Sequence, residues 1–375
     1  MVIKNGFVLI FEEGGFVKKD IKIEGKKILE VSENIEAETY YDASGMYITP
    51  GLIDAHSHIG VSEEGAGSIG DDCNDYSDAL MPYLEAIDAF NPYDIAITSA
   101  VKAGITTACT GPGSDSVVGG VFSTMKLWGN VADEMVITRK ASVKCSFGEN
   151  PKTAGLGHKS RMGTAYILRK CLEDAIDYRH NKHEAMKANE YFKTDIGMEN
   201  MLLVLDKKVP FQVHAHRADD ICTAIRIARE YDVRLVLVHC TDGHLIVDYI
   251  SKFDYPVILG PSLYPRSKSE SLNRTFKTAA VLHKAGVKIC ITADHDVTPI
   301  YFLPVYAAQS VKEGLPEIEG LKAITKNAAE VLGIQDIKGE IKAGFDADIV
   351  VWDTHPFDYK SKAVKVWIEG QDVLA

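Results

Sequence analysis

The chain has 375 residues, 46% of them apolar and 25% charged, and its 53 acidic side chains outnumber the 41 Lys and Arg to give a formal charge of −12. This composition is that of a globular protein, and the length fits one large α/β domain with a minor one. The acidic balance argues against nucleic acid as the main partner, because such binding depends on neutralising phosphates with cations.

The cysteines and the apolar stretches bear on redox chemistry and location. The seven cysteines are scattered and form no CxxC pair, so neither a disulfide framework nor a thiolate zinc site is expected. The first residues carry no signal-peptide pattern, and no uncharged apolar run is long enough to span a bilayer. We therefore expect a cytoplasmic protein with no membrane or nucleic-acid partner. A homo-oligomer is compatible with the sequence.

Both ends of the chain are rich in strand-forming residues. Such runs, broken by glycine and charged turns, occupy 7–11, 16–25, 26–32, 346–353 and 362–370. A lone hairpin is marginal in water. We therefore expect residues 1–50 and 336–375 to pack together as one small β domain.

The middle of the chain alternates short apolar runs with amphipathic stretches. Strands are expected within 46–58, 105–113, 117–127, 141–151, 209–217, 234–240, 255–262 and 287–294. A long helical stretch is expected from about Arg161 to Lys208. Alternation of nearly continuous apolar strands with helices indicates a parallel sheet covered on both faces. About eight strands fit a closed (β/α)8 barrel over residues 51–335, with an open sheet as the alternative.

Histidines and one carboxylate stand at the expected carboxyl ends of these strands. His56 and His58 are two residues apart in "GLIDAHSHIG", so they point to the same side of an extended strand. Three later strands end in His214, His239 and Asp294. In a parallel barrel the carboxyl ends of the strands face the active site. Imidazoles and a carboxylate that converge from different strands indicate a divalent-metal site.

The segment "TPGLIDAHSHIG" resembles the PG(L/I)(I/V)DxHxH signature of the metal-dependent amidohydrolase superfamily. "YDASGMYITPG" and "GEIKAGFDADIVVWD" are similar to the superfamily's exit from its N-terminal sheet and its return to that sheet, so the resemblance covers essentially the whole chain. "GENPK", "HKSRMGTA" and "HAHRADDI" resemble the branch related to imidazolonepropionases and metallo-dipeptidases. The resemblance implies a distorted (β/α)8 TIM barrel with a small β-sandwich built from both termini.

The resemblance also implies the metal ligands, because the order of the family motifs is kept. The implied ligands are His56, His58, His214, His239 and Asp294. One or two divalent ions are expected, with zinc first and iron or manganese as alternatives. Asp294 would carry the proton from the metal-bound water to the leaving nitrogen, and His239 would help to hold the carbonyl oxygen. A helix N-cap is the alternative interpretation of Asp294.

A second ion needs a bridging carboxylate. The superfamily uses a carbamylated lysine or a glutamate from strand 3 or 4. Glu149, in the turn "GENPK", is the preferred ligand, and Lys144 is the alternative if its strand is regular and points it inward. A solvated loop carboxylate is the other interpretation of Glu149.

The remaining candidates concern the substrate. Deaminases of this superfamily place a glutamate three residues after the strand-5 histidine, where this chain has Arg217, so deamination is disfavoured. Arg217 would suit a substrate carboxylate, although an ion pair with Asp219 or Asp220 is nearly as good an interpretation. Further substrate-binding candidates are His216, Tyr264, Arg266 and His295.

These residues favour a metal-dependent enzyme. The expected activity is hydrolysis of a C–N bond in a small substrate that carries a carboxylate, such as a cyclic amide, an N-acyl-amino acid or a dipeptide. The alternatives are a non-catalytic barrel that serves as a scaffold or binding protein, and an isomerase, lyase or deaminase on the same fold.

Overall fold

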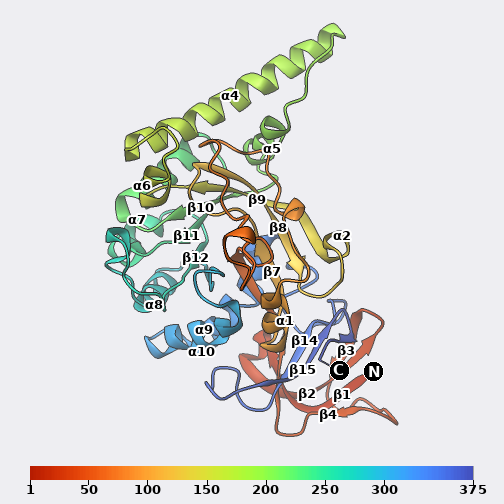
Figure 1. Cartoon of the computed structure of the whole chain (residues 1–375). Coiled ribbons are helices and arrows are strands. Elements are labelled where there is room, and N and C mark those ends of the chain that lie inside the picture. The colour runs from red at the N-terminus through yellow and green to blue at the C-terminus, as the bar shows by residue number, and fades with distance from the viewer. Residues whose placement is uncertain (375) are drawn as a thin grey trace.

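The computed structural model describes residues 1–374 and contains two sheets of eight strands each (Figure 1). The first holds both ends of the chain, which lie close together in Figure 1. Its strands are β1 (Val2–Ile10), β2 (Gly15–Glu24), β3 (Lys27–Ser32), β4 (Tyr41–Asp42), β5 (Tyr47–Pro50), β14 (Ile349–Trp352), β15 (Ala363–Ile368) and β16 (Gln371–Asp372). β5 pairs with β14 in antiparallel register, Ile48 opposite Val351, and this pair joins the two ends.

The second sheet is a nearly closed barrel. Its strands follow one another in chain order: β6 (Leu52–Ser57), β7 (Ile105–Thr110), β8 (Val118–Lys126), β9 (Val136–Ser146), β10 (Phe211–Ala215), β11 (Leu235–His239), β12 (Val257–Leu259) and β13 (Ile289–Ile291). The seam between β6 and the end of β13 is bridged by hydrogen bonds, with Ala293 N donating to Asp54 Oδ2 at 3.0 Å and Thr292 Oγ1 donating to the His56 carbonyl at 2.5 Å. The expected fold class, a TIM-like barrel with a β domain from both termini, is confirmed.

One barrel strand runs against the expected direction. β8 pairs antiparallel with both β7 and β9, whereas the sequence pattern favoured parallel strands throughout. The connection from β7 to β8 is a short loop that contains Gly111 and Gly113, and a parallel connection would need a crossover of a dozen residues or more. The loop is too short for that crossover, so the chain turns back.

Helices surround the barrel (Figure 1). They are α1 (Ile95–Lys102), α2 (Ala132–Met135), α3 (Glu149–Thr153), α4 (Arg161–Ala188), α5 (Ile196–Leu205), α6 (Ala218–Glu230), α7 (Val247–Ile250), α8 (Lys277–Lys284), α9 (Leu303–Lys312), α10 (Glu317–Ala323) and α11 (Lys326–Leu332). The long helical stretch expected to Lys208 is two helices, because Asn189 ends α4 in the left-handed conformation and the Asp195 carboxylate caps α5. In residues 1–374 no helix combines the length and apolar character that a bilayer crossing requires.

The interior of the barrel is apolar and closed at one end. Ile53, Phe122, Val238 and Cys290 belong to one buried cluster together with residues of α11. α11 lies at the amino ends of the strands, where Asn327 Nδ2 donates to the carbonyl of Ile289 at 2.8 Å. The opposite, carboxyl ends are therefore free to present side chains to a ligand.

Candidate metal centre

The two histidines of β6 face the aspartate that follows β13. Their Nε2 atoms lie 3.6 Å (His56) and 3.4 Å (His58) from Asp294 Oδ1. The other ring nitrogens are occupied: His56 Nδ1 lies 2.7 Å from Gln212 Oε1, and His58 Nδ1 donates to the Gly111 carbonyl at 2.7 Å. Because a carbonyl only accepts, His58 Nδ1 carries a proton, and its Nε2 atom is the one that faces Asp294. Burial works against a charged His58, but Cys73 and Asp294 outweigh it and raise the pKa of His58, so a bound metal would replace a proton at Nε2.

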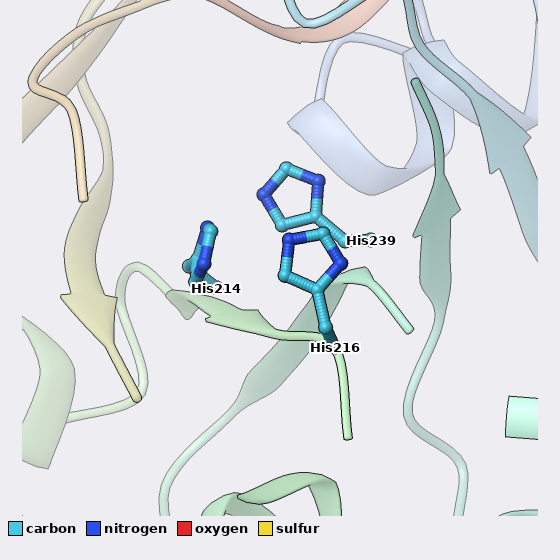
Figure 2. A group of neighbouring side chains, drawn as sticks. All are labelled: His214, His216 and His239. Carbon is cyan, nitrogen blue, oxygen red and sulfur yellow. The ribbon is translucent and has the colours of Figure 1, made fainter. Parts of the chain in front are cut away.

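A second group of imidazoles stands at the ends of β10 and β11. Figure 2 shows His214, His216 and His239 turned toward one another, with the rings of His216 and His239 stacked 4.5 Å apart. Their nitrogens lie within 4.8 Å of one another, and His239 also belongs to a group of the same size with His56 and Asp294. Two adjoining sets of potential metal ligands therefore share His239.

Two buried polar atoms in these groups lack a hydrogen-bond partner in the described chain. They are His214 Nε2 and Asp294 Oδ1. His214 Nδ1 forms a hydrogen bond with Ser114 Oγ at 2.9 Å, and this bond fixes the orientation of the ring and therefore of its free Nε2 atom. A buried polar atom without a partner costs about 1–3 kcal/mol. A divalent cation would satisfy both atoms, so the donor set fits a metal ion.

The protonation states suit a cation. Burial lowers the pKa of His56, His214 and His216, and it lowers the pKa of His239 to about 4, so these imidazoles are neutral and able to coordinate. Burial by itself raises the pKa of Asp294, but the hydrogen bond and the charge of His58, whose own pKa is raised, oppose it, and the Asp294 pKa lies below its usual range. The centre therefore holds neutral imidazoles at His56, His214, His216 and His239, and an ionised Asp294 that faces His58.

Lys144, rather than Glu149, lies at this centre. β9 stays regular to Ser146, Lys144 pairs in register with Gln212, and its fully buried Nζ lies 3.3 Å from His56 Nε2. Gly148 (φ 91°) then turns the chain. The Glu149 carboxylate accepts hydrogen bonds from Ser269 Oγ at 2.5 Å and from Glu270 N at 3.1 Å, and it joins neither ligand group.

Of the expected substrate-binding residues, some lie at the centre and others lie away from it. Arg217 donates to both carboxylate oxygens of Asp219 at 3.0 Å on the exposed surface, which is the ion-pair alternative. Arg266 donates to the carbonyls of Leu272 and Arg274, each at 2.9 Å. His216 belongs to one of the two metal-ligand groups, with His214 and His239, and His295 is buried next to Asp294 with its Nε2 atom unpartnered in the described chain. Tyr264 lies on the rim.

The sequence analysis missed two residues that touch the ligands. Gln212 holds His56, and its position two residues before His214 on the same face of β10 could have revealed it. Glu270 is buried in the loop after β12, with its Oε1 atom 3.9 Å from His214 Nε2. The sequence around Glu270 has no regular apolar pattern, so it does not predict that this side chain is buried.

A cavity of about 600 Å³ lies beside the centre. Cys73, Met81 and Gly113 line it, and Cys73 is buried and acts with Asp294, against the effect of burial, to raise the pKa of His58. Its wall also carries Asp75 and Asp88. The volume is that of a small-molecule site.

Histidines, a lysine and an aspartate lie together at the carboxyl ends of the barrel strands. This arrangement is typical of barrel proteins that bind a metal ion at that end of the barrel. The model of the Amidohydrolase family matches residues 47–373, and the chain belongs to this family. The resemblance to the amidohydrolase superfamily is thereby confirmed.

The relatives agree with this assignment. Amidohydrolase tasK of Hapsidospora irregularis is 28% identical over 395 aligned positions, which cover 97% of this chain and 39% of tasK. The crystal structure of an amidohydrolase from Thermotoga maritima MSB8 is 40% identical, with a TM-score of 0.96 and 99% of both chains covered. A β-aspartyl dipeptidase from Fervidobacterium islandicum AW-1 is 18% identical, with a TM-score of 0.60 over 99% of this chain and 96% of its own, and shares the fold.

Proposed function

We propose that the protein is a metal-dependent hydrolase of a C–N bond in a small carboxylate-bearing amide, such as a cyclic amide, an N-acyl-amino acid or a dipeptide. The observation that carries the proposal is the pair of ligand groups that share His239, with His214 Nε2 and Asp294 Oδ1 buried and unpartnered in the described chain. Membership of the Amidohydrolase family supports amide hydrolysis as the reaction.

The residues that would hold the metal are His56, His58, Lys144, His214, His239 and Asp294, with His216 as a further donor. Zinc is the first expectation, because nitrogen and carboxylate donors in a buried site suit it. A divalent ion held here would lower the pKa of a water molecule and polarise the substrate carbonyl. The ionised Asp294 is placed to accept the proton of the attacking water and to donate it to the leaving nitrogen.

Lys144 replaces Glu149 in this proposal as the source of a bridging carboxylate. Burial lowers the Lys144 pKa to about 8, so much of the amine is neutral at mildly alkaline pH. A neutral amine adds to CO2 with formation of one N–C bond and release of one proton. The product is a carbamate, which would bring two carboxylate oxygens next to His56.

Carbamate formation on Lys144 should depend steeply on pH. With a pKa of about 8, roughly 1% of the amine is neutral at pH 6 and about half at pH 8. At constant CO2 pressure, the carbamate signal of ¹³CO2-treated, metal-free protein in ¹³C NMR should therefore grow strongly between these values. A signal that is independent of pH, or that survives in Lys144→Ala, would contradict the assignment.

The metal part of the proposal predicts that His56→Ala with His58→Ala lowers the metal content of the purified protein by at least one equivalent. The reason is that both Nε2 donors that face Asp294 are removed. Elemental analysis measures the content, and hydrolysis of a panel of dipeptides, N-acyl-amino acids and cyclic amides measures activity. The matched control is His180→Ala with His183→Ala, which removes two exposed histidines of α4. Unchanged metal in the first double variant, or a panel that is inert with metal-replete protein, would refute the function.

A further inference from the structure

A cationic recess lies along the loop that follows β12 and the start of α8. Its volume is about 350 Å³, and its charged lining is Arg266, Arg274 and Lys277 against the single carboxylate of Glu313. A hollow of about 10 Å³, which has room for about one water, adjoins it and is lined by His239, Thr241 and Arg274. Arg274 therefore lines both the recess and the hollow. The hollow is also lined by His239, which belongs to both metal-ligand groups.

Arg274 has hydrogen-bonding capacity to spare. Its Nη1 donates to the carbonyls of Tyr264 at 3.0 Å and Pro265 at 2.8 Å, and the guanidinium lies 5.6 Å from the centre of the Tyr264 ring. Nε and Nη2 have no hydrogen-bond partner in residues 1–374, and no carboxylate oxygen of this part of the chain lies within 4.0 Å of the guanidinium. Arginine stays charged at any working pH, so this half-buried cation has no counter-ion of its own.

The other arginines nearby are already engaged. Arg217 forms a two-fold hydrogen bond with Asp219. Arg266 donates through Nε and Nη2 to the carbonyls of Leu272 and Arg274, and so holds the loop that carries Arg274. Of these three, Arg274 alone combines a free Nε–Nη2 edge with a hollow that reaches His239. That edge offers two parallel donors, which is the geometry that a carboxylate accepts.

We propose that Arg274 binds the carboxylate of the substrate in this recess and thereby sets the specificity of the enzyme for acidic amides. This inference rests on the proposed amide hydrolysis and names the residue that selects the substrate. One carboxylate oxygen would take the place of the single water that the hollow between Arg274 and His239 can hold, on the β12 side of the centre, and the rest of the substrate would extend toward the 600 Å³ cavity beside His58. A neutral amide would leave the Arg274 charge unpaired, which is unfavourable in a half-buried position.

The test compares carboxylate and carboxamide forms of the best substrate from the panel in wild-type protein, Arg274→Met, Arg274→Lys and Arg217→Met. Wild type should prefer the carboxylate in kcat/KM by about 10- to 100-fold, the range of a charge-assisted hydrogen bond. Arg274→Met should lose this preference through KM, with kcat on the carboxamide and the metal content unchanged. Arg274→Lys should keep part of the preference. Arg217→Met, the matched control on the surface, should keep all of it.

Calorimetric titration of the metal-loaded protein with N-acetylglycine and with N-acetylglycinamide tests Arg274 separately from catalysis. Tighter binding of N-acetylglycine that disappears in Arg274→Met supports the inference even if the panel shows no hydrolysis, in which case the proposed function alone fails. A wild-type protein that does not favour N-acetylglycine overturns the inference, as does an Arg274→Met variant that retains the carboxylate preference. Loss of that preference in Arg217→Met would overturn it in favour of the surface arginine.

Discussion

Replacing Lys144 by alanine should remove bound metal and lower kcat/KM by about 10³-fold, because a Lewis-acid metal contributes several kcal/mol to such a reaction. Lys144 is fully buried, and its Nζ lies 3.3 Å from His56 Nε2. Its deletion takes away the proposed carbamate and leaves a space within the ligand groups. Elemental analysis and steady-state kinetics on the same samples measure the two effects. Millimolar acetate or propionate should restore part of both, since a short carboxylate can occupy the vacated space.

Glu149→Gln is the matched control for this variant. The Glu149 carboxylate accepts hydrogen bonds from Ser269 and Glu270 N and lies in neither ligand group, so its amide counterpart should retain the metal. Loss of metal in Glu149→Gln together with retention in Lys144→Ala would reverse the assignment and restore Glu149 as the ligand.

Asp294→Asn should lower kcat by about 10²- to 10⁴-fold, the usual contribution of general acid–base catalysis. Asparagine preserves the shape of the side chain but neither accepts the proton of the attacking water nor carries negative charge. The buried carboxylate lies 3.4 Å from His58 Nε2 and 3.6 Å from His56 Nε2, so its contribution to metal binding is also lost. Kinetics should therefore be measured with metal in excess, which separates proton transfer from metal loss.

The control for this variant is Asp296→Asn, two residues further along the chain and exposed. It should behave as wild type. A metal-replete Asp294→Asn enzyme with unchanged kcat would show that another group carries the proton, and the buried Glu270 near His214 would be the next candidate.

Local patterns in the sequence were sufficient to predict the barrel and to place His56, His58, His214 and His239 at the ends of its strands. The two-residue spacing of His56 and His58 reflects the period of an extended strand, and His214 and His239 end apolar runs that are unmistakable strands. The resemblance in "TPGLIDAHSHIG" and the strand-rich chain ends were enough to expect the sheet that joins both termini.

Tertiary structure alone decided the features that depend on distant partners. Lys144 rather than Glu149 lies at the centre because β9 remains regular to Ser146 and Gly148 then turns the chain, which no local periodicity records. The direction of β8 follows from a connection too short for a crossover. Arg217 and Arg274 look alike in sequence, yet Arg217 pairs with Asp219 while Arg274 lines the recess. The physical reason is that hydrophobic periodicity is a local property of the chain, whereas the partner of a charge is chosen by packing between segments that are far apart in sequence.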